Sequence, residues 1–421
     1  MTTEGNEALR EAQIPGEPLR DPAELAELAT HPGLCATCVH LRLLRSPRST
    51  FARCAKAERD PAFPRYPRLP VVACSGHRPA PREEAPSPPR MADVAVPAAA
   101  PAAAVLHVTN GDAVLAGFRA GGIGGEQLAW RDVLHDGPVP MKATLEELSE
   151  VRARALAAFG WGAYAELRAA FARRDAALAR CGEHAEAVLW FEHDLYDQLQ
   201  LLQLLDWFAQ HGTGGARLSL IEIGSFPGVV PFHGLGQLDG SQFLELLPQR
   251  QPVSMRQLRT AAAAWRDFRA DDPLALAERA KTPQEELPFL APALRRFCEE
   301  YPSTRDGLAR SERQVLAAVA AGASRPAEIY LKSWDAEECP WGDSSIFLRV
   351  EGLARAAVPA LSRSEHGYEP TPLGERLLRG DADWVLESGG LDRWLGGVHL
   401  QGTAVRWRWN ADVAGVVAAN G

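Results

Sequence analysis

The sequence predicts a mixed α/β protein. We expect a Rossmann-like, mostly parallel sheet domain, followed by a helical, winged-helix-like domain and preceded by a small four-cysteine metal-binding segment. Short apolar runs alternate with helical patterns between residues 105 and 224, which is typical of parallel strands joined by helices. Four cysteines fall within residues 35–74, and a stretch rich in Pro and Ala separates them from the first apolar run.

These observations divide the chain into six parts. A proline-rich segment without periodicity is typical of a semi-extended linker and marks the clearest boundary. The predicted parts are a polar lead at 1–30, the four-cysteine module at 31–78, the linker at 79–104, the Rossmann-like domain at 105–240, a helical connector at 241–310 and the winged-helix-like domain with a terminal β-hairpin at 311–421.

Charge is distributed unevenly along the 421 residues. The whole chain has a formal net charge of −9, but residues 35–78 contain nine Lys or Arg and only two acids, a local balance of +7 that leaves −16 for the remainder. These basic residues could offset an anionic thiolate site, dock within the chain onto the acidic remainder, or bind nucleic acid. We favour compensation or docking over nucleic acid.

The N-terminus is polar and acidic and lacks the features of a signal peptide. No apolar run approaches the length of a membrane span, so we expect no membrane association. Seven cysteines in a chain of this size are too few for a secreted disulfide scaffold. We therefore expect a cytoplasmic protein with reduced cysteines.

Four cysteines have the spacing of metal ligands. Cys35 and Cys38 form a C-x2-C pair, which places two thiolates on one side of a tight turn, and Cys54 and Cys74 follow after 15 and 19 residues. A structural zinc ion and an iron–sulfur cluster both use four thiolates, so either cofactor fits. His40 and His77 are reserve ligands, and four unrelated reduced cysteines are the alternative.

Polar residues concentrate where the strands of the α/β domain are expected to end. The expected strands span 105–109, 126–134, 187–194 and 217–224, and ligands bind at the carboxyl ends of such strands. We assign possible acid–base roles to Glu192, His193, His135 and Asp136, and ligand contacts to Asn110, Gly111, Asp112, Arg131, Asp132, Asp194, Asp197 and Gln198. Several acids together also suit a divalent cation, Mg²⁺ or Mn²⁺.

Some of these residues have simpler structural explanations. Asp194 lies where a helix N-cap belongs, Asp197 is three residues further on, and Asp112 is a possible cap of the first helix. A strand end has no structural need of the Glu192–His193 pair. His135 and Asp136 precede a Gly-Pro pair and are equally suited to a turn.

Two strings resemble a known family. LHVTNGDAVLAGFRAGGIGGEQLAWRDVLHDGPVP and LWFEHDLYDQLQLLQLLDWF are similar to the bacterial domain-of-unknown-function 1835 family, and GGVHL with WRW resembles the end of its longer members. The resemblance covers about residues 105–410 and implies a Rossmann-like domain followed by a winged-helix-like region. It implies no reaction, and the four-cysteine module lies outside it.

The C-terminal part has the element order of a winged helix. Helices are expected at 311–322, 325–334 and 343–356, followed by a hairpin at 360–371, a helix at 372–380 and one closing hairpin at 393–410. Ser254 with Gln257, and Ser311 with Gln314, fit capping boxes. The third helix offers Arg349 and Arg355 against two acids, which is a poor phosphate-binding surface. Trp334 and Trp341 are expected in the core.

Two functions follow from this interpretation. The first is an enzyme or binder of a phosphorylated or nucleotide-like small molecule at the strand ends, with the cysteine module as an accessory. The alternative is a metal- or redox-responsive regulatory or adaptor protein that uses the winged helix for DNA or protein contacts.

Overall fold

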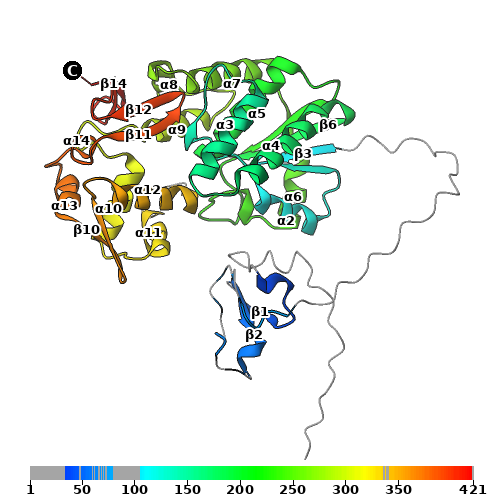
Figure 1. Cartoon of the computed structure of the whole chain (residues 1–421). Coiled ribbons are helices and arrows are strands. Elements are labelled where there is room, and N and C mark those ends of the chain that lie inside the picture. The colour runs from blue at the N-terminus through cyan, green and yellow to red at the C-terminus, as the bar shows by residue number, and fades with distance from the viewer. Residues whose placement is uncertain are drawn as a thin grey trace, which may run out of the picture. The chain divides into compact units, whose positions relative to one another are not determined.

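The computed structural model describes residues 34–46, 49–58, 60, 62–64, 67, 69, 71, 74–78, 105–334, 337 and 341–419. The chain divides into two compact units, residues 1–98 and 99–421 (Figure 1). The predicted polar lead and the whole of the predicted linker lie outside the described residues.

The N-terminal unit is built on one antiparallel hairpin. Strand β1 (Leu41–Ser46) pairs with β2 (Ser49–Cys54), and short 3-10 turns, η1 (Leu34–Thr37) and η2 (Ala55–Glu58), flank it. The core of the described part is small, with Leu41 and Ala52 buried at its centre.

The second unit contains a five-stranded sheet, as predicted for a mixed α/β fold with a mostly parallel sheet. Its strand order is β4 (Glu126–Ala129), β3 (Val105–Thr109), β6 (Glu186–Glu192), β7 (Arg217–Ile223) and β8 (Gln251–Pro252). The first four strands are parallel, and the short β8 is antiparallel to β7. The chain runs from β3 outward to β4 and then returns past β3 to β6. The direction of winding therefore reverses between β3 and β6, the place where such sheets bind ligands.

Helices cover both faces of this sheet. They are α2 (Asp112–Gly121), α3 (Leu145–Ala158), α4 (Tyr164–Ala179), α5 (Leu195–His211), α6 (Gly240–Leu246) and α7 (Met255–Phe268). In β6 the side chains alternate between faces, as a strand requires. Val188 and Trp190 pack with α2 and α6, whereas Leu189 and Phe191 pack with α5. The fully buried β6 thus separates two apolar cores.

The expected strand at 126–134 is shorter than predicted. β4 ends at Ala129, because the side chains of Trp130 and Asp132, which follow it, are buried and held by contacts with other parts of the chain. The indole of Trp130 is buried and donates a hydrogen bond to Gln203 at 2.8 Å, and Asp132 forms a buried ion pair with Arg152 at 2.9 Å. These two contacts draw the chain away from the sheet.

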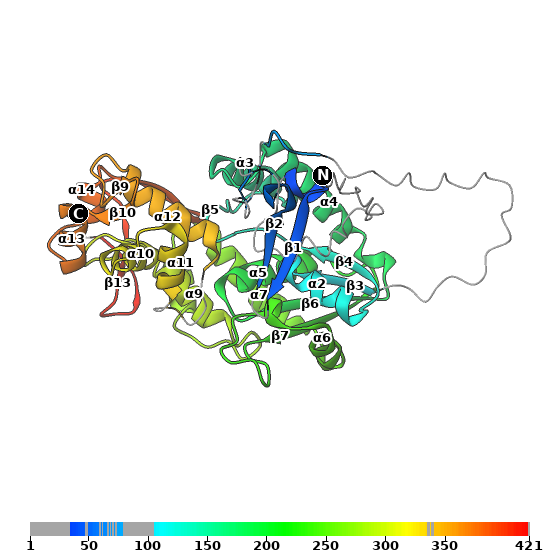
Figure 2. The same ribbon diagram turned by 90° about the horizontal axis from the view of Figure 1, so that it is seen from below.

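Helices and three hairpins make up the C-terminal part. The helices are α8 (Leu274–Arg279), α9 (Leu290–Cys298), α10 (Arg310–Ala320), α11 (Pro326–Ser333), α12 (Asp343–Arg355), α13 (Pro372–Arg379) and α14 (Trp384–Glu387). β9 (Leu361–Ser364) and β10 (Gly367–Pro370) form an antiparallel hairpin after α12. Figure 2 shows α10, α11 and α12 gathered at one end of the sheet domain.

The tail differs from the single hairpin expected at 393–410. β11 (Leu391–Gly396) pairs with β12 (Val398–Gly402), and a second hairpin joins β13 (Trp407–Asn410) to β14 (Gly415–Ala418). β11 also pairs in parallel with β5 (Gly137–Pro138), a contact between segments far apart in the sequence. No local pattern in the sequence could specify that pairing.

One of the two predicted capping boxes is correct. Ser254 accepts a hydrogen bond from the Gln257 amide, and the Gln257 side chain accepts one from the Ser254 amide at 2.8 Å. The box at Ser311 is wrong, because α10 begins one residue earlier and Ser311 is buried inside it. Its hydroxyl instead donates to Glu300 at 2.5 Å.

None of the helices in the described part of the chain combines the length and apolar character that a membrane span requires.

Candidate functional site

The carboxyl ends of β3 and β6 are joined by one buried side chain. Asp197, in the first turn of α5, accepts hydrogen bonds from the Asn110 amide group at 2.8 Å and from the Glu192 backbone amide at 2.9 Å. Asn110 follows β3 and Glu192 ends β6. These contacts bring three of the predicted residues together where the winding of the sheet reverses.

Three carboxyl groups converge at this point, and we call Glu192, Asp194 and Asp197 the acidic cluster. Their nearest ligand oxygens all lie within 4.8 Å of one another. Asp194 is the N-cap of α5 and accepts from the Asp197 amide at 2.8 Å. Glu192 accepts a hydrogen bond from the Leu235 amide. Asp194 thus has the predicted structural role and also belongs to a possible cation site.

Crowding and burial hold protons on the acidic cluster. Burial, and then the charge of Asp194, raise the pKa of Glu192 to about 8. Burial also raises the pKa of Asp194 to about 6, and burial followed by the charges of its two neighbours raises that of Asp197 well above its ordinary value. Three carboxylates so close together cannot all be ionised near neutral pH unless a cation compensates them.

A fourth carboxyl group, which the sequence analysis did not assign, adjoins the cluster. The side-chain amide of Gln198 donates at 2.9 Å both to the Glu192 carbonyl and to the Glu222 carboxyl group on β7. Burial raises the pKa of Glu222 to about 7. The sequence signal for this residue was a glutamate within the mostly apolar string LSLIEIG.

The acidic cluster opens into a cleft of about 1230 Å³. One wall is formed by the strand ends and the loops that follow them. The other comes from the C-terminal helices. The polar and aromatic residues of this second wall are Arg295 and Arg296 of α9, Glu299 directly after α9, Arg310 of α10, Tyr330 of α11, and, after α11, Trp334, Glu337, Trp341, Asp343, Ser344 and Ser345. The C-terminal part therefore completes the site, a role that the sequence analysis did not predict.

The arginines of the second wall are partly balanced by acids. Arg310 lies 2.9 Å from Glu337, and Arg296 lies 2.7 Å from both Glu337 and Glu300. Arg295 is the most open of the three, with its side chain 58% exposed and 3.5 Å from Glu299. The wall thus presents three guanidinium groups to the cleft, and each of them is paired with an acid.

His135 and Asp136 belong to a buried network that connects the sheet domain to α12. Ser345 donates to Asp136 at 2.6 Å and lies 3.1 Å from Nε2 of His135. Asp136 also pairs with Arg349 at 2.5 Å. Because the Ser345 proton is directed at Asp136, Nε2 of His135 must donate, which leaves Nδ1 as an acceptor. Burial lowers the pKa of His135 to about 4, so the ring is neutral.

Two neighbouring rings of the cleft each have a buried polar atom without a hydrogen-bond partner. The atoms are Nδ1 of His135 and Nε1 of Trp341, whose rings lie 4.5 Å apart. Both residues line the cleft and both are more than nine-tenths buried. A neighbouring acceptor and donor without partners is an arrangement that a bound polar group could satisfy. Trp341 is buried, as expected, but it also forms part of the site.

The remaining predicted residues fall into three groups. His193 lines the cleft, with its ring 6.0 Å from Phe232. Asp112 and Arg131 form an exposed ion pair with each other and do not line the cleft. Three further assignments are structural in character: Gly111 is the N-cap of α2, Asp132 is paired with Arg152, and Gln198 supports β6 and β7.

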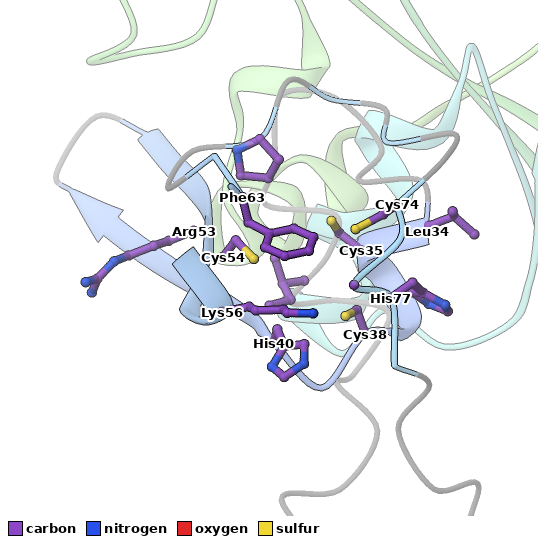
Figure 3. Close-up of a pocket in the computed structure, with 13 residues that line it drawn as sticks. Leu34, Cys35, Cys38, His40, Arg53, Cys54, Lys56, Phe63, Cys74 and His77 are labelled. Atoms are coloured by element: carbon purple, nitrogen blue, oxygen red, sulfur yellow. The ribbon is translucent and has the colours of Figure 1, made fainter. Parts of the chain in front are cut away.

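The four cysteines of the N-terminal unit line one pocket (Figure 3). Cys35 lies in η1 and Cys54 ends β2, whereas Cys38 and Cys74 lie outside the named helices and strands. All four are free thiols. Burial, and then the neighbouring thiols, raise the pKa of Cys35 to about 11. His40 and His77 line the same pocket.

Comparison of the chain with protein-family models and with curated proteins gives no match.

Proposed function

We propose that the cleft binds a divalent cation, Mg²⁺ or Mn²⁺, at the acidic cluster and acts on a phosphorylated or nucleotide-like small molecule. The observation that carries the proposal is the convergence of three carboxyl groups within 4.8 Å at the edge of an open cleft. Carboxylate oxygens are the ligands these cations prefer, and a cation would relieve the repulsion that keeps the cluster protonated.

The opposite wall supports an anionic ligand. A cation at Glu192, Asp194 and Asp197 would face the arginines of α9 and α10, and phosphate groups bind in such settings between metal and guanidinium. A cleft of about 1230 Å³ is large enough for a nucleotide-sized molecule. The donor at Trp341 and the acceptor at His135 could then pair with a polar group of the ligand.

The proposed roles follow from position. The bound cation would polarise a phosphate oxygen or activate a water molecule. Glu192, Asp194 and Asp197 would hold it as carboxylates once the cation displaces the protons of the cluster. His193 would accept a proton from the attacking group at the mouth of the cleft. His135, neutral and fixed by Ser345, would orient the ligand through Nδ1.

Binding of Mn²⁺ to the metal-free protein, followed by calorimetry and thermal unfolding, tests this proposal. A ligand present at a hundred times its Kd stabilises the folded state by about 2.7 kcal/mol. Glu192→Gln and Asp194→Asn should each weaken Mn²⁺ binding by more than about tenfold. Asp112→Asn is the matched control, since this acid lies outside the cleft, and it should leave binding unchanged. Equal effects of all three substitutions would reject the acidic cluster as the site.

We also propose the two folds that the sequence resemblance implies. The strand order β4-β3-β6-β7 supports a Rossmann-like domain, and three helices followed by a hairpin support a winged-helix-like module. Membership of the domain-of-unknown-function 1835 family rests on the strings quoted above.

A DNA-binding adaptor is the alternative, and the same module is its only support. Arg349, one of the two arginines on the third helix, is buried against Asp136, and Arg355 pairs with Glu351 at 2.7 Å. Neither arginine is well placed for phosphate. Salt-dependent retention of the protein on DNA that disappears in Arg355→Ala would favour the adaptor.

For the N-terminal unit, we propose a metal site formed by Cys35, Cys38, Cys54 and Cys74. The support is their common pocket and the small apolar core around it. Zinc and an iron–sulfur cluster both fit this donor set.

A further inference from the structure

We infer that a second cavity, lined by the Asp136–Arg349 pair, binds an uncharged and mostly apolar small molecule that carries a hydrogen-bond acceptor. The cavity has a volume of about 590 Å³ and is bordered by residues of α3, α12 and β11 (Figure 1). We call it the α3–α12 cavity. Its size is typical of small-molecule sites. The inference goes beyond the proposed cation site and does not depend on it.

The α3–α12 cavity is separate from the cleft, although one buried network touches both. Asp136 and Arg349 line the cavity, whereas His135 and Ser345, which both contact Asp136, line the cleft. Within the described part of the chain the two spaces share no lining residue. A ligand in the cavity therefore leaves the cleft free.

Most of the wall of the α3–α12 cavity is apolar. Val151, Ala155 and Phe159 follow one another at intervals of four residues, so they lie along one face of α3 and its C-cap. Leu348 of α12 and Trp394 of β11 line the same space. Burial of apolar surface against these side chains would stabilise a bound ligand of the same character.

A glycine in α12 keeps the cavity open. Gly352 lines it, and no neighbouring atom lies within 4 Å of the position that a Cβ atom would take. Glycine is less favourable than alanine inside a helix, and here neither a positive φ angle nor close packing requires it. The missing side chain thus leaves space for a ligand at the expense of the helix.

One hydrogen-bond donor of the wall is unused. Nη2 of Arg393 donates to Glu312, but Nη1 of Arg393 is buried and has no hydrogen-bond partner. A buried donor without an acceptor is unfavourable, and a carbonyl or ether oxygen of a ligand would satisfy it. Both Arg393 and Glu312 line the cavity, so a ligand there lies within reach of this donor.

The charged side chains of the wall already have partners, which favours an uncharged ligand. The pairs are Arg349 with Asp136, Arg393 with Glu312, Arg154 with Glu150, and Asp392 with His399. A further charge buried beside these pairs would be left without compensation, which costs free energy. An uncharged molecule with one acceptor avoids this cost.

Fluorescence of Nile red mixed with the full-length protein tests the inference. This flat, uncharged dye carries a carbonyl oxygen, and its emission rises in apolar surroundings. We expect saturable binding of one dye per chain. Gly352→Phe should fill the cavity and weaken binding by more than about tenfold. Arg393→Lys keeps a positive charge beside Glu312 but removes the unused donor, so it should weaken binding about fivefold.

Gly342→Phe is the matched control. Gly342 is the N-cap of the same helix and also has no neighbouring atom within 4 Å of an added Cβ, but it lines the cleft. This variant should bind Nile red as the wild type does. Gly352→Ala should also keep the affinity and raise the midpoint of thermal unfolding by about 1–2 °C, since alanine favours a helix.

Four results would overturn the inference. Absence of Nile red binding, or wild-type affinity in a folded Gly352→Phe, would reject the cavity as a binding site. A greater loss in Gly342→Phe than in Gly352→Phe would place the dye in the cleft. Tighter binding of the anionic dye 1-anilinonaphthalene-8-sulfonate, abolished by Gly352→Phe, would reject an uncharged ligand. Thermal unfolding shows whether each variant is folded, and if Gly352→Phe is not, undiminished affinity in Arg393→Lys rejects the site.

Discussion

Glu192 is the residue whose charge state matters most for the proposed cation site. The folded, metal-free chain keeps the Glu192 proton up to a pKa of about 8, whereas an unfolded chain loses it at the ordinary value of 4.5. Between these values the folded state binds more protons, so the free energy of unfolding falls as the pH rises. Each complete proton of difference contributes about 1.4 kcal/mol per pH unit.

Glu192→Gln should therefore flatten the dependence of stability on pH. We expect the substitution to stabilise the metal-free protein above neutral pH and to change its stability little well below pH 4.5, where Glu192 is protonated in both states. Urea unfolding over this range of pH measures the effect. Saturating Mn²⁺ should flatten the dependence of the wild type's stability on pH, and it should change that dependence little in the variant. A wild-type slope of the opposite sign would contradict the raised pKa.

Gly234 is a second residue on which the acidic cluster depends. Its φ angle is +149°, and an added Cβ atom would collide with the Glu192 carboxyl group. Gly234→Ala should lower stability by about 1–3 kcal/mol through backbone strain and also weaken Mn²⁺ binding. Gly228, with φ of +82° and open space around it, provides the matched control. Gly228→Ala should lower stability and leave the affinity for Mn²⁺ unchanged. If Gly228→Ala and Gly234→Ala weakened Mn²⁺ binding equally, Gly234 would have no specific role in the cation site.

At the scale of elements, α12 connects the two parts of the second unit. Its Arg349 side chain is 5% exposed and pairs with Asp136, with Glu300 at 3.7 Å. Burial alone would raise the pKa of Asp136, but Arg349 and then His135 lower it below its ordinary value. Arg349→Ala should cost about 3–5 kcal/mol, because it leaves buried carboxylates uncompensated.

Arg355 on the same helix provides the control. Its side chain is 75% exposed and pairs only across one turn with Glu351, so Arg355→Ala should change the free energy of unfolding by less than about 0.5 kcal/mol. Denaturant unfolding of both variants measures the difference. Similar small changes would show that the Asp136–Arg349 pair contributes little to holding α12 in place.

These elements also show what the sequence could and could not predict. Local patterns predicted the buried strands and the Ser254 capping box, because each depends on neighbouring residues. The convergence of Asn110, Glu192 and Asp197 was predictable from strand polarity alone. The second wall was not, since Arg295 and Trp341 reach the cleft only through long-range packing. The pairing of β11 with β5 depends on tertiary structure in the same way.

At the scale of the molecule, each compact unit has its own apolar core. The buried residues of the N-terminal core are Leu41 and Ala52, and the two large cores contain residues of the second unit only. The excess of basic residues in the N-terminal unit has two competing explanations, compensation of an anionic cofactor or docking onto the acidic remainder. They predict different consequences of removing the unit.

A chain that begins at Met91 distinguishes these explanations. If the basic residues compensate an anionic metal–thiolate site, the shortened chain should keep its midpoint of thermal unfolding within about 2 °C, which corresponds to less than about 1 kcal/mol. It should also keep its affinity for Mn²⁺ while losing the metal bound by the four cysteines. Docking predicts instead a lower midpoint at low salt, with the difference from the full chain vanishing as added salt screens the charges. Thermal unfolding of both chains across a salt series measures this difference in midpoint. A difference that vanishes with salt would show that the basic residues dock onto the second unit and do not serve to compensate a cofactor.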